Sequence, residues 1–503
     1  MTDGGMPAPR FGEIVRSVSP NRFLIPPEGV GQIMDPGTTM LDKIWKLHAV
    51  EDMGSGHSLI AVDRCYLNDL GGGTALRLLS DAKLPANDPN RTFCFTDHTV
   101  TSKEDRTEDE TVISRAFTGR FRKHCREFGI PLIGLDNPRQ GIEHVAAPEM
   151  GLTLPGMTVA CGDSHTMTHG ALGALAFGNG SSEMYHCIAT GTMIVKKPMA
   201  MRITIKGKYD SSRVEAMDVA LYLLSKFGTR VGSGFAIEFS GEVVSRMDIE
   251  DRMTLCNLAQ EMGAELAFTA PDEKTYAYIA DREYAPAGEM FNALVSHCRT
   301  LTSDADAVFD KEISVDVTGL RPQISWGTTP ALVTSLGGSV PSAGDVPDLD
   351  ADSFNEALTY LGLEPGRPLA GTKIDMIFIG SCATGRLGSL KRAADALRGK
   401  RIAPYVTAWV VPGSEPVKRE AERLGLDVVF KEAGCFWGAP GCSLCCGANG
   451  ETVPPFLRCV SSANRNFIGR QGPNARTHLA GPVTAILAAV AGAIPDDIGG
   501  GPL

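Results

Sequence analysis

The sequence predicts an α/β fold with mostly parallel strands, and two observations carry this prediction. Short apolar runs alternate along the chain with stretches whose apolar residues recur at helical spacing, which is typical of α/β layers. Polar side chains that can do chemistry follow several of these runs directly. In open α/β sheets, ligands bind beyond the carboxyl ends of the strands. The 503 residues exceed one ordinary hydrophobic core, so we expect about two to four domains.

The elements follow in chain order. Residues 1–39 contain Pro and Gly but few periodic apolar positions, so we expect an N-terminal extension that is loosely ordered or docks on the body. A helix is expected from Met40 to His48, and a helical pattern returns at 483–493. The polar stretch 337–352 is the candidate linker before the last domain. Short apolar runs that alternate with the helices are found at 158–160, 201–205, 374–379 and 427–430.

Composition narrows the class of protein. Hydrophobic residues make up 43% and charged residues 21%, as in soluble globular proteins. No apolar run has the roughly 18–20 residues of a membrane span, and no apolar segment typical of a signal peptide opens the chain. Thirteen cysteines, an odd number, do not suit a secreted disulfide framework, which indicates a reducing, cytoplasmic compartment. The net charge of −11, without Lys/Arg runs, argues against nucleic acid or an anionic membrane as a partner.

Three predicted strands end in reactive side chains. Asp97 and His98 follow the strand predicted at 91–96, the motif Cys161-Gly162-Asp163-Ser164-His165 follows 158–160, and Cys382 follows 374–379. A single Asp-His pair is more often a hydrogen-bonded surface turn than a catalytic pair. Three such strand ends together predict one cleft with acid–base and metal chemistry.

The cysteines give a second pattern. Cys382 and the pair Cys442-Ser443-Leu444-Cys445 supply three thiolates. Three is one short of a closed tetrahedral zinc site and of a fully ligated [4Fe–4S] cluster, and a cluster with one open iron can act as a Lewis acid. The spacing alone leaves open a zinc site closed by Cys435 or Cys446, a redox dithiol, and inert buried cysteines.

Longer motifs make a resemblance specific. Over about residues 40–495 the chain resembles the large subunits of the isopropylmalate dehydratases, a family of the aconitase superfamily. The motifs that carry it are Asp97-His98, Gln140-Gly141-Ile142-Glu143-His144-Val145, Ile237-Glu238-Phe239, Met253-Thr254-Leu255-Cys256-Asn257, and the runs 154–166, 440–445 and 464–472. Their length and order exclude chance as an explanation.

The resemblance implies an aconitase-like fold. It consists of three α/β domains with mostly parallel sheets around a central iron–sulfur cleft, which we place at 40–200, 201–344 and 345–503, the last carrying the cluster cysteines. The swivelling fourth domain of single-chain aconitases, which carries the catalytic serine base, is absent from this sequence. We therefore expect a small subunit, on the order of 150–200 residues, to supply that serine in a heterodimer.

The resemblance also implies the site. Cys382, Cys442 and Cys445 would hold a [4Fe–4S] cluster with one open iron, leaving Cys435 and Cys446 as non-ligands. His98, paired with Asp97, would assist the leaving hydroxyl, and Asp163, His165 and His144 would shape the hydrogen bonds on the iron side. Glu238 would lie near the water on the iron, Ser164 would orient the substrate, and Arg465 and Arg470 would clamp its carboxylates.

The implied reaction is the reversible dehydration and rehydration of a substituted malate, foremost 2-isopropylmalate to 3-isopropylmalate in leucine biosynthesis. Two departures from the family pattern leave room for a sister substrate such as citramalate, dimethylmalate or homocitrate. The cluster loop reads Cys382-Ala383-Thr384-Gly385-Arg386 and lacks the usual asparagine, and Gly71-Gly72-Gly73-Thr74 replaces a segment whose glutamine contacts substrate in the family. An RNA-binding protein and a non-catalytic iron–sulfur scaffold are the alternatives from other classes. The acidic balance disfavours the first and the retained polar set disfavours the second.

Overall fold

The computed structural model describes residues 37–344, 346 and 349–499, and most of their strands lie in three sheets in which every pairing is parallel. The predicted α/β class is therefore confirmed. In spatial order, the first sheet contains β5 (Leu132–Ile133), β4 (Thr92–Phe95), β3 (Arg64–Asn68), β6 (Thr158–Cys161) and β7 (Leu175–Gly178). The second contains β11 (Leu266–Thr269), β10 (Phe235–Ser240), β9 (Met199–Lys206) and β12 (Lys311–Asp316). The third contains β17 (Phe436–Trp437), β16 (Thr407–Val410), β15 (Met376–Ile379), β18 (Arg458–Ser461) and β19 (Arg476–Leu479).

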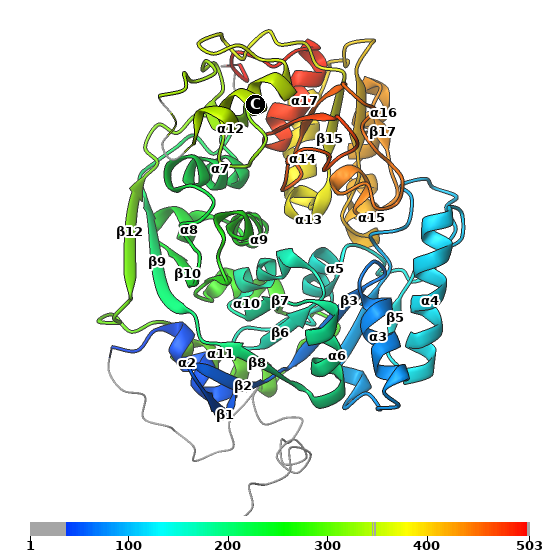
Figure 1. Ribbon diagram of the computed structural model, residues 1–503, viewed down its shortest axis with the longest axis vertical. Helices are drawn as coiled ribbons and strands as arrows, with labels where there is room; N and C mark the ends of the chain where they lie inside the picture. The colour runs from blue at the N-terminus through cyan, green and yellow to red at the C-terminus, as the bar shows by residue number, and fades with distance from the viewer. Residues whose placement is uncertain (1–36, 345, 347–348, 500–503) are drawn as a thin grey trace, which may run out of the picture.

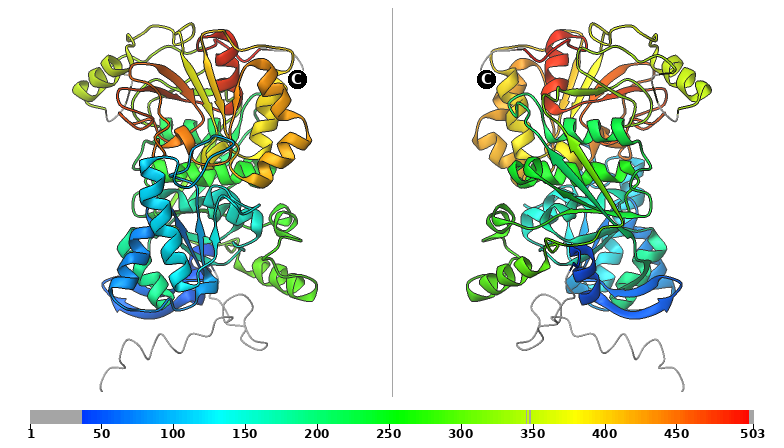
Figure 2. Two further views of the ribbon diagram at one scale, coloured as in Figure 1. Left: turned by 90° about the vertical axis from the view of Figure 1, so that its right-hand side faces the viewer. Right: turned by 90° about the vertical axis from the view of Figure 1, so that its left-hand side faces the viewer.

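The three sheets occupy different parts of the molecule. In Figure 1 the third sheet and its helices lie at the top, the second sheet lies at the left, and the first sheet lies at the lower right. The side views in Figure 2 also place the C-terminal part above the rest. Two small antiparallel sheets complete the strands: β1 (Ala49–Gly54), β2 (His57–Ala61) and β8 (Thr192–Lys196), and β13 (Gln323–Ser325) with β14 (Val333–Ser335).

Helices surround these sheets. Those up to the end of the first sheet are α2 (Met40–His48), α3 (Gly72–Asp81), η1 (Pro89–Arg91), α4 (Val112–Phe128), α5 (Glu143–Met150), η2 (Ser164–Leu172) and α6 (Ser181–Thr190). The second part contains α7 (Ala216–Phe227), α8 (Glu242–Arg246), α9 (Ile249–Leu258), η3 (Ala259–Met262), α10 (Glu273–Ile279) and α11 (Glu289–Leu301). The last part contains α12 (Ala351–Leu361), α13 (Ser381–Thr384), α14 (Leu387–Leu397), α15 (Glu415–Arg423), α16 (Leu426–Ala433), η4 (Ser443–Cys445) and α17 (Pro482–Ala491).

Local sequence explains these elements. Strands β4, β6 and β15 are buried along their whole length, as expected for short apolar strands covered on both faces. Helix α2 begins after Thr39, whose hydroxyl accepts from the Asp42 backbone N–H while the Asp42 carboxylate accepts from the Thr39 N–H. Because this capping box stands directly before the apolar spacing, the predicted helix 40–48 begins and ends as the sequence indicates.

One apolar run was assigned to the wrong kind of element. The run 427–430 was read among the strand-like segments, but it lies inside helix α16. Its buried residues Leu426, Phe430 and Ala433 recur at helical spacing, whereas Val428 is exposed. Three apolar residues, Val428, Val429 and Phe430, are too few to distinguish the two periods. The runs at 158–160, 201–205 and 374–379 do contain strands, and α17 lies within the predicted helical stretch.

Two large cores hold the molecule together. One joins residues of the first sheet, such as Phe95 and Val159, to residues of the second sheet, such as Ile203 and Ile237. The other surrounds the third sheet. Most of the expected extension, residues 1–36, lies outside the described residues. The domain boundaries at 200/201 and 344/345 stay predictions.

Candidate active site and cluster-binding cysteines

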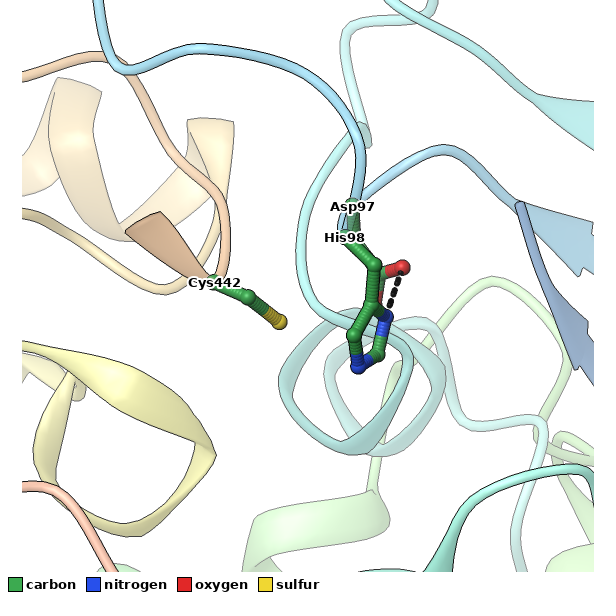
Figure 3. A group of neighbouring side chains, drawn as sticks. All are labelled: Asp97, His98 and Cys442. Atoms are coloured by element: carbon green, nitrogen blue, oxygen red, sulfur yellow. Dashed lines mark hydrogen bonds and ion pairs between the residues drawn. The ribbon is translucent and has the colours of Figure 1, made fainter. Parts of the chain in front are cut away.

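The structure brings two of the three predicted strand ends together, and the predicted cluster ligand Cys442 joins them. The His98 ring, just after β4, has its Nε2 3.6 Å from Asp163 Oδ2, just after β6. Asp97, His98 and Cys442 each place a ligand-type atom within 4.8 Å of the others. Figure 3 shows the Cys442 side chain pointing toward the His98 imidazole. Residues from the first and third sheets therefore share one site.

Asp97 and His98 form a buried pair. Asp97 Oδ1 lies 2.7 Å from His98 Nδ1, and Asp97 Oδ2 accepts from the Glu143 backbone N–H at 3.0 Å. Burial raises the pKa of Asp97 to about 6, although the charge and hydrogen bond of His98 oppose this. Burial also acts to lower the pKa of His98, but the charge of Asp97 outweighs it and holds that pKa well above its usual value. The pair is built to keep a proton on His98, with Nε2 directed into the site.

Asp163 is the centre of a second set of contacts. Its Oδ1 lies 2.9 Å from His144 Nε2 and accepts from the His165 backbone N–H at 2.7 Å. Burial acts to raise the pKa of Asp163, yet the hydrogen bonds from His144, His165 and His98 hold it well below the usual value. His144 is fixed from its other side, where Nδ1 lies 3.2 Å from His169 Nε2. Asp163 is therefore a permanent anion that orients two predicted histidines.

A carboxylate that the sequence analysis did not select completes this network. Glu261 Oε1, in η3, lies 2.9 Å from His165 Nε2 and accepts from Arg465 Nε at 2.7 Å. Arg465 Nη1 also donates to Ser164 Oγ at 3.2 Å. Burial would raise the pKa of Glu261, but the His165 hydrogen bond and charge lower it. Its position four residues after Asn257, the last residue of a recognised motif, is the sequence signal that could have revealed it.

Glu238 lies apart from this network. It sits inside strand β10, and its Oε2 accepts from Ser303 Oγ at 2.6 Å. The charges of Arg202 and Lys43 act on its carboxyl, whose pKa burial raises. None of its described contacts is with a predicted site residue. Its catalytic role stays a prediction, while Glu261 occupies the position among the histidines.

The three predicted cluster ligands are buried and free of disulfides. Cys382 Sγ accepts hydrogen bonds from the amides of Asn257 at 3.1 Å and Asn464 at 3.2 Å. The Cys445 sulfur lies 3.2 Å from Asn464 Oδ1. Amide N–H groups directed at sulfur stabilise the negative charge of thiolates and of the cluster they hold. The donor set thus fits an iron–sulfur cluster, and Asn257 and Asn464 are further functional residues that spacing did not reveal.

Arg470 reaches the same cysteines. Its Nη2 lies 4.0 Å from Cys445 Sγ, and its guanidinium lies over the Phe467 ring, 5.7 Å from the centroid. Its Nε is buried and has no hydrogen-bond partner among the described residues. A buried unpaired donor costs about 1–3 kcal/mol, more for a charged group. A bound carboxylate would satisfy it, as the predicted clamp requires.

The two departures from the family pattern have local explanations. The Thr384 hydroxyl contacts Ser462 Oγ at 2.7 Å and donates to the Gly380 carbonyl at 2.7 Å, so its hydrogen bonds lie within the part of the chain around the third sheet. At Gly72 an added Cβ would lie 2.6 Å from the Phe121 ring and 2.8 Å from the Leu67 side chain. Close packing of α3 on α4 and β3 therefore requires this glycine.

Comparison with known proteins identifies the family. The family model described as "Aconitase family (aconitate hydratase)" matches residues 42–492. This chain belongs to the aconitase family. The 3-isopropylmalate dehydratase large subunit 1 of Bradyrhizobium diazoefficiens is 48% identical over 468 residues, which cover 93% of this chain and 98% of that protein. The crystal structure of Thermococcus kodakaraensis aconitase X in its holo-form matches with a TM-score of 0.44 and 14% identity, covering 85% of this chain and 89% of that one.

Family membership implies hydro-lyase chemistry with an iron–sulfur cofactor, in agreement with the cysteine geometry. Among the residues that the structure describes, none of the helices combines the length and apolar character needed to span a bilayer.

Proposed function

We propose that this chain is the cluster-binding large subunit of a two-subunit hydro-lyase that interconverts 2-isopropylmalate and 3-isopropylmalate by dehydration and rehydration, a cytoplasmic step of leucine biosynthesis. The observation that supports the proposal is the close approach of His98 to Asp163 and to Cys442, with Arg465 bound to Glu261 in the neighbouring network. The 48% identity to a large subunit with this name supports the substrate.

Cys382, Cys442 and Cys445 would hold a [4Fe–4S] cluster, and a cluster with one open iron would supply a Lewis acid toward the substrate hydroxyl. Asn257 and Asn464 orient the Cys382 thiolate. Cys435 and Cys446 are not ligands. Cys435 lies in the core around the third sheet with Phe430 and Trp437, and Cys446 packs against that core.

The chain's own side chains bind the substrate and carry out one of the two proton transfers of the dehydration, the protonation of the leaving hydroxyl. Arg465 and Arg470 form forked hydrogen bonds with the carboxylates, and Ser164 orients the nearer one. His98, held protonated by Asp97, donates a proton to the leaving hydroxyl. Asp163, His144 and His165 keep the iron-side hydrogen bonds in place, together with Glu261.

The second proton needs a base from the partner. The carbon-bound proton beside a carboxylate is a very weak acid, so its removal needs a positioned base and a positive field for the developing charge. We assign this base to a serine of a small subunit, because the relative is named a large subunit. The isolated chain should therefore bind substrate weakly and turn over almost nothing.

A test combines the chain with its co-encoded small subunit under anaerobic conditions. Hydration is then measured across maleates with isopropyl, methyl, dimethyl and carboxyalkyl substituents. The proposal expects the highest kcat/KM with isopropylmaleate, and activity only with both subunits. Equal activity of the chain alone would refute the two-subunit assignment. A preference for dimethylmaleate or citraconate would favour a sister hydratase, which the Gly71-Gly72-Gly73-Thr74 segment supports because it offers no glutamine amide to the substrate.

Oxidation provides a second test. An iron without a protein ligand is lost most readily, so exposure to air should give an inactive three-iron protein. Ferrous iron with thiol should restore activity without added sulfide. Full activity after prolonged exposure to air would contradict the open-iron cofactor.

A further inference from the structure

The helix that carries His144 contains a proline that leaves one of its carbonyls without a helical partner. Helix α5 spans Glu143–Met150, and Pro148 lies inside it. In an α-helix the carbonyl of residue i accepts from the N–H of residue i+4, so the His144 carbonyl would normally accept from residue 148. Proline has no N–H, so this bond is missing. A buried carbonyl left in that state destabilises the helix turn that holds His144.

Arg386 supplies the missing donor. Its Nη2 donates to the His144 carbonyl at 2.9 Å and to the Cys382 carbonyl at 3.2 Å. The second carbonyl belongs to helix α13 (Ser381–Thr384), which ends before it could use a backbone N–H at position 386. One guanidinium nitrogen therefore joins two helix turns that are 238 positions apart in sequence. One turn carries His144, the first member of the acid–base relay His144–Asp163–His98, and the other carries Cys382.

The position of Arg386 is costly for the fold. The residue is 2% exposed, and its Nε has no hydrogen-bond partner among the described residues. Its charge acts on the buried carboxyls of Glu149 and Glu250, where it opposes the rise in pKa that burial causes. A buried cation needs such compensation because leaving water costs several kcal/mol. Burial of this cation is unfavourable, and both of its carbonyl contacts join the His144 turn to the Cys382 turn. This indicates that the residue serves to align the two turns.

The aligned turns lead directly to the reacting groups. His144 Nε2 holds Asp163, whose other oxygen lies 3.6 Å from His98 Nε2. On the other side, Cys382 Sγ receives the amides of Asn257 and Asn464. A shift between the turn of His144 and the turn of Cys382 would thus move the acid–base relay relative to the thiolate.

We propose that Arg386 is a positioning residue that locks the His144 turn, broken by Pro148, to the Cys382 turn, and so fixes the acid–base relay relative to the cluster. The proposal deepens the proposed function and rests on it for the reaction. The alignment itself concerns the folded chain and can be measured without activity.

The test uses the substitution Arg386→Met, which keeps length and removes the donors, and Pro148→Ala, which returns an N–H to the His144 carbonyl. Arg386→Met should lower kcat of the reconstituted two-subunit enzyme by about 10–100-fold with little change in KM, because outer contacts of metal ligands have effects of that size. It should also speed cluster loss to a chelator and speed hydrogen exchange in the peptide covering α5. Pro148→Ala alone should resemble the wild type.

The double variant separates the two contacts. It should slow hydrogen exchange in α5 again, because the His144 carbonyl regains a helical donor. The kcat should stay low and cluster loss should stay fast, because the His144 and Cys382 turns are still not joined. Arg458→Met is the matched control: Arg458 is also buried and also donates to a backbone carbonyl, that of Leu361 at 2.6 Å, but at the opposite end of β18 from the site residues. Arg386→Lys, which keeps a charge and one donor, replaces the methionine variant if that protein does not fold.

Two results would overturn the proposal. One is an Arg386→Met protein whose cluster loss, α5 exchange and kcat match those of Arg458→Met. The other is a double variant that recovers wild-type kcat, because repair of helix α5 alone would then explain the loss without any link between the two turns. A wild-type enzyme that fails to hydrate any substituted maleate would instead sink the proposed function, and the exchange experiment on the chain alone would still decide the role of Arg386.

Discussion

The first and second parallel sheets share an architecture but contribute to the site in different ways. In the first sheet, the predicted residues Asp97, His98 and Asp163 follow the ends of β4 and β6, and they meet. In the second sheet, the predicted residue Glu238 lies within β10, beside Arg202 of β9 in the ladder, and contacts Ser303. A side chain after a strand can turn into the cleft, whereas one inside a strand is held in the layer beside the sheet.

The second sheet still serves the site, but through the helical segment between β10 and β11. Asn257 lies in α9 and Glu261 in η3, and they reach Cys382 and His165. The comparison teaches that a carboxylate of the second sheet's part reaches His165 from a packed helical segment, whereas one inside the strand does not.

The largest expected effect concerns the cysteines. Cys382→Ser, Cys442→Ser and Cys445→Ser should each abolish the cluster's visible absorbance and all activity, because a hydroxyl oxygen is a poorer ligand than thiolate for iron–sulfur irons. The comparison extends to the third sheet, where Cys382 follows the end of β15 and Cys435 follows helix α16. Cys435→Ser and Cys446→Ser should keep both properties. If Cys446→Ser loses the cluster and Cys445→Ser keeps it, then Cys446 is the ligand and Cys445 is not.

Next in size is the contrast between two glutamates. Glu261→Gln removes the charge that holds His165 and Arg465, so kcat/KM should fall by about 10²–10⁴-fold, the range of acid–base and positioning groups. Glu238→Gln is isosteric and should change kcat/KM far less, since its contact is with Ser303. The measurement is steady-state kinetics at equal cluster content. A larger loss of kcat/KM for Glu238→Gln than for Glu261→Gln would support the catalytic role of Glu238 predicted from the sequence. It would contradict the contrast between the two glutamates.

The carboxylate clamp should show an intermediate effect. Arg465→Lys and Arg470→Lys should each lose about 2–4 kcal/mol in kcat/KM, because lysine cannot form the forked pair and leaves one carboxylate oxygen unpaired. The cluster spectrum should stay unchanged in both. Near wild-type kinetics in both variants would place substrate binding elsewhere.

The smallest effect concerns a buried carboxyl with a structural task. Asp218, in α7, accepts the Glu215 and Gln323 backbone N–H groups at 2.8 Å each. Burial, and then the charge of Glu215, raises its pKa from 3.8 to about 8. Between about pH 4 and pH 8 the folded chain keeps this proton and the unfolded chain releases it. Stability should therefore fall as pH rises through that window, by at most about 1.4 kcal/mol per pH unit.

Asp218→Asn cannot titrate and should lack this slope. Its melting temperature should lie below that of the wild type at pH 5, where the protonated carboxyl is well accommodated, and the gap should narrow toward pH 8. Scanning calorimetry of the cluster-free chain between pH 5 and pH 8 measures both proteins. Parallel curves for the two proteins would show that Asp218 does not titrate in this range.

Much of the fold was predictable because it depends on local pattern. The apolar strands β4, β6 and β15, and the capped helix α2, are legible from a few neighbouring residues. The helical state of the run 427–430 was not predictable from the run alone, because the buried residues Leu426 and Ala433 lie outside it. Gly425 and Gly434 mark the two ends of the helix. A short apolar run satisfies either period, and only packing on the third sheet selects one.

By itself, the sequence determined the parallel α/β class, the three cysteines with their family, and the Asp-His strand ends, because these depend on residue order and spacing. Only the tertiary structure decided that Glu261 lies against His165 and Arg465, and that Arg386 bonds the carbonyls of His144 and Cys382. These contacts join segments far apart in the chain. Their donors and acceptors meet only when the sheets are packed together, so these contacts cannot be predicted from the residues next to each of them in the sequence.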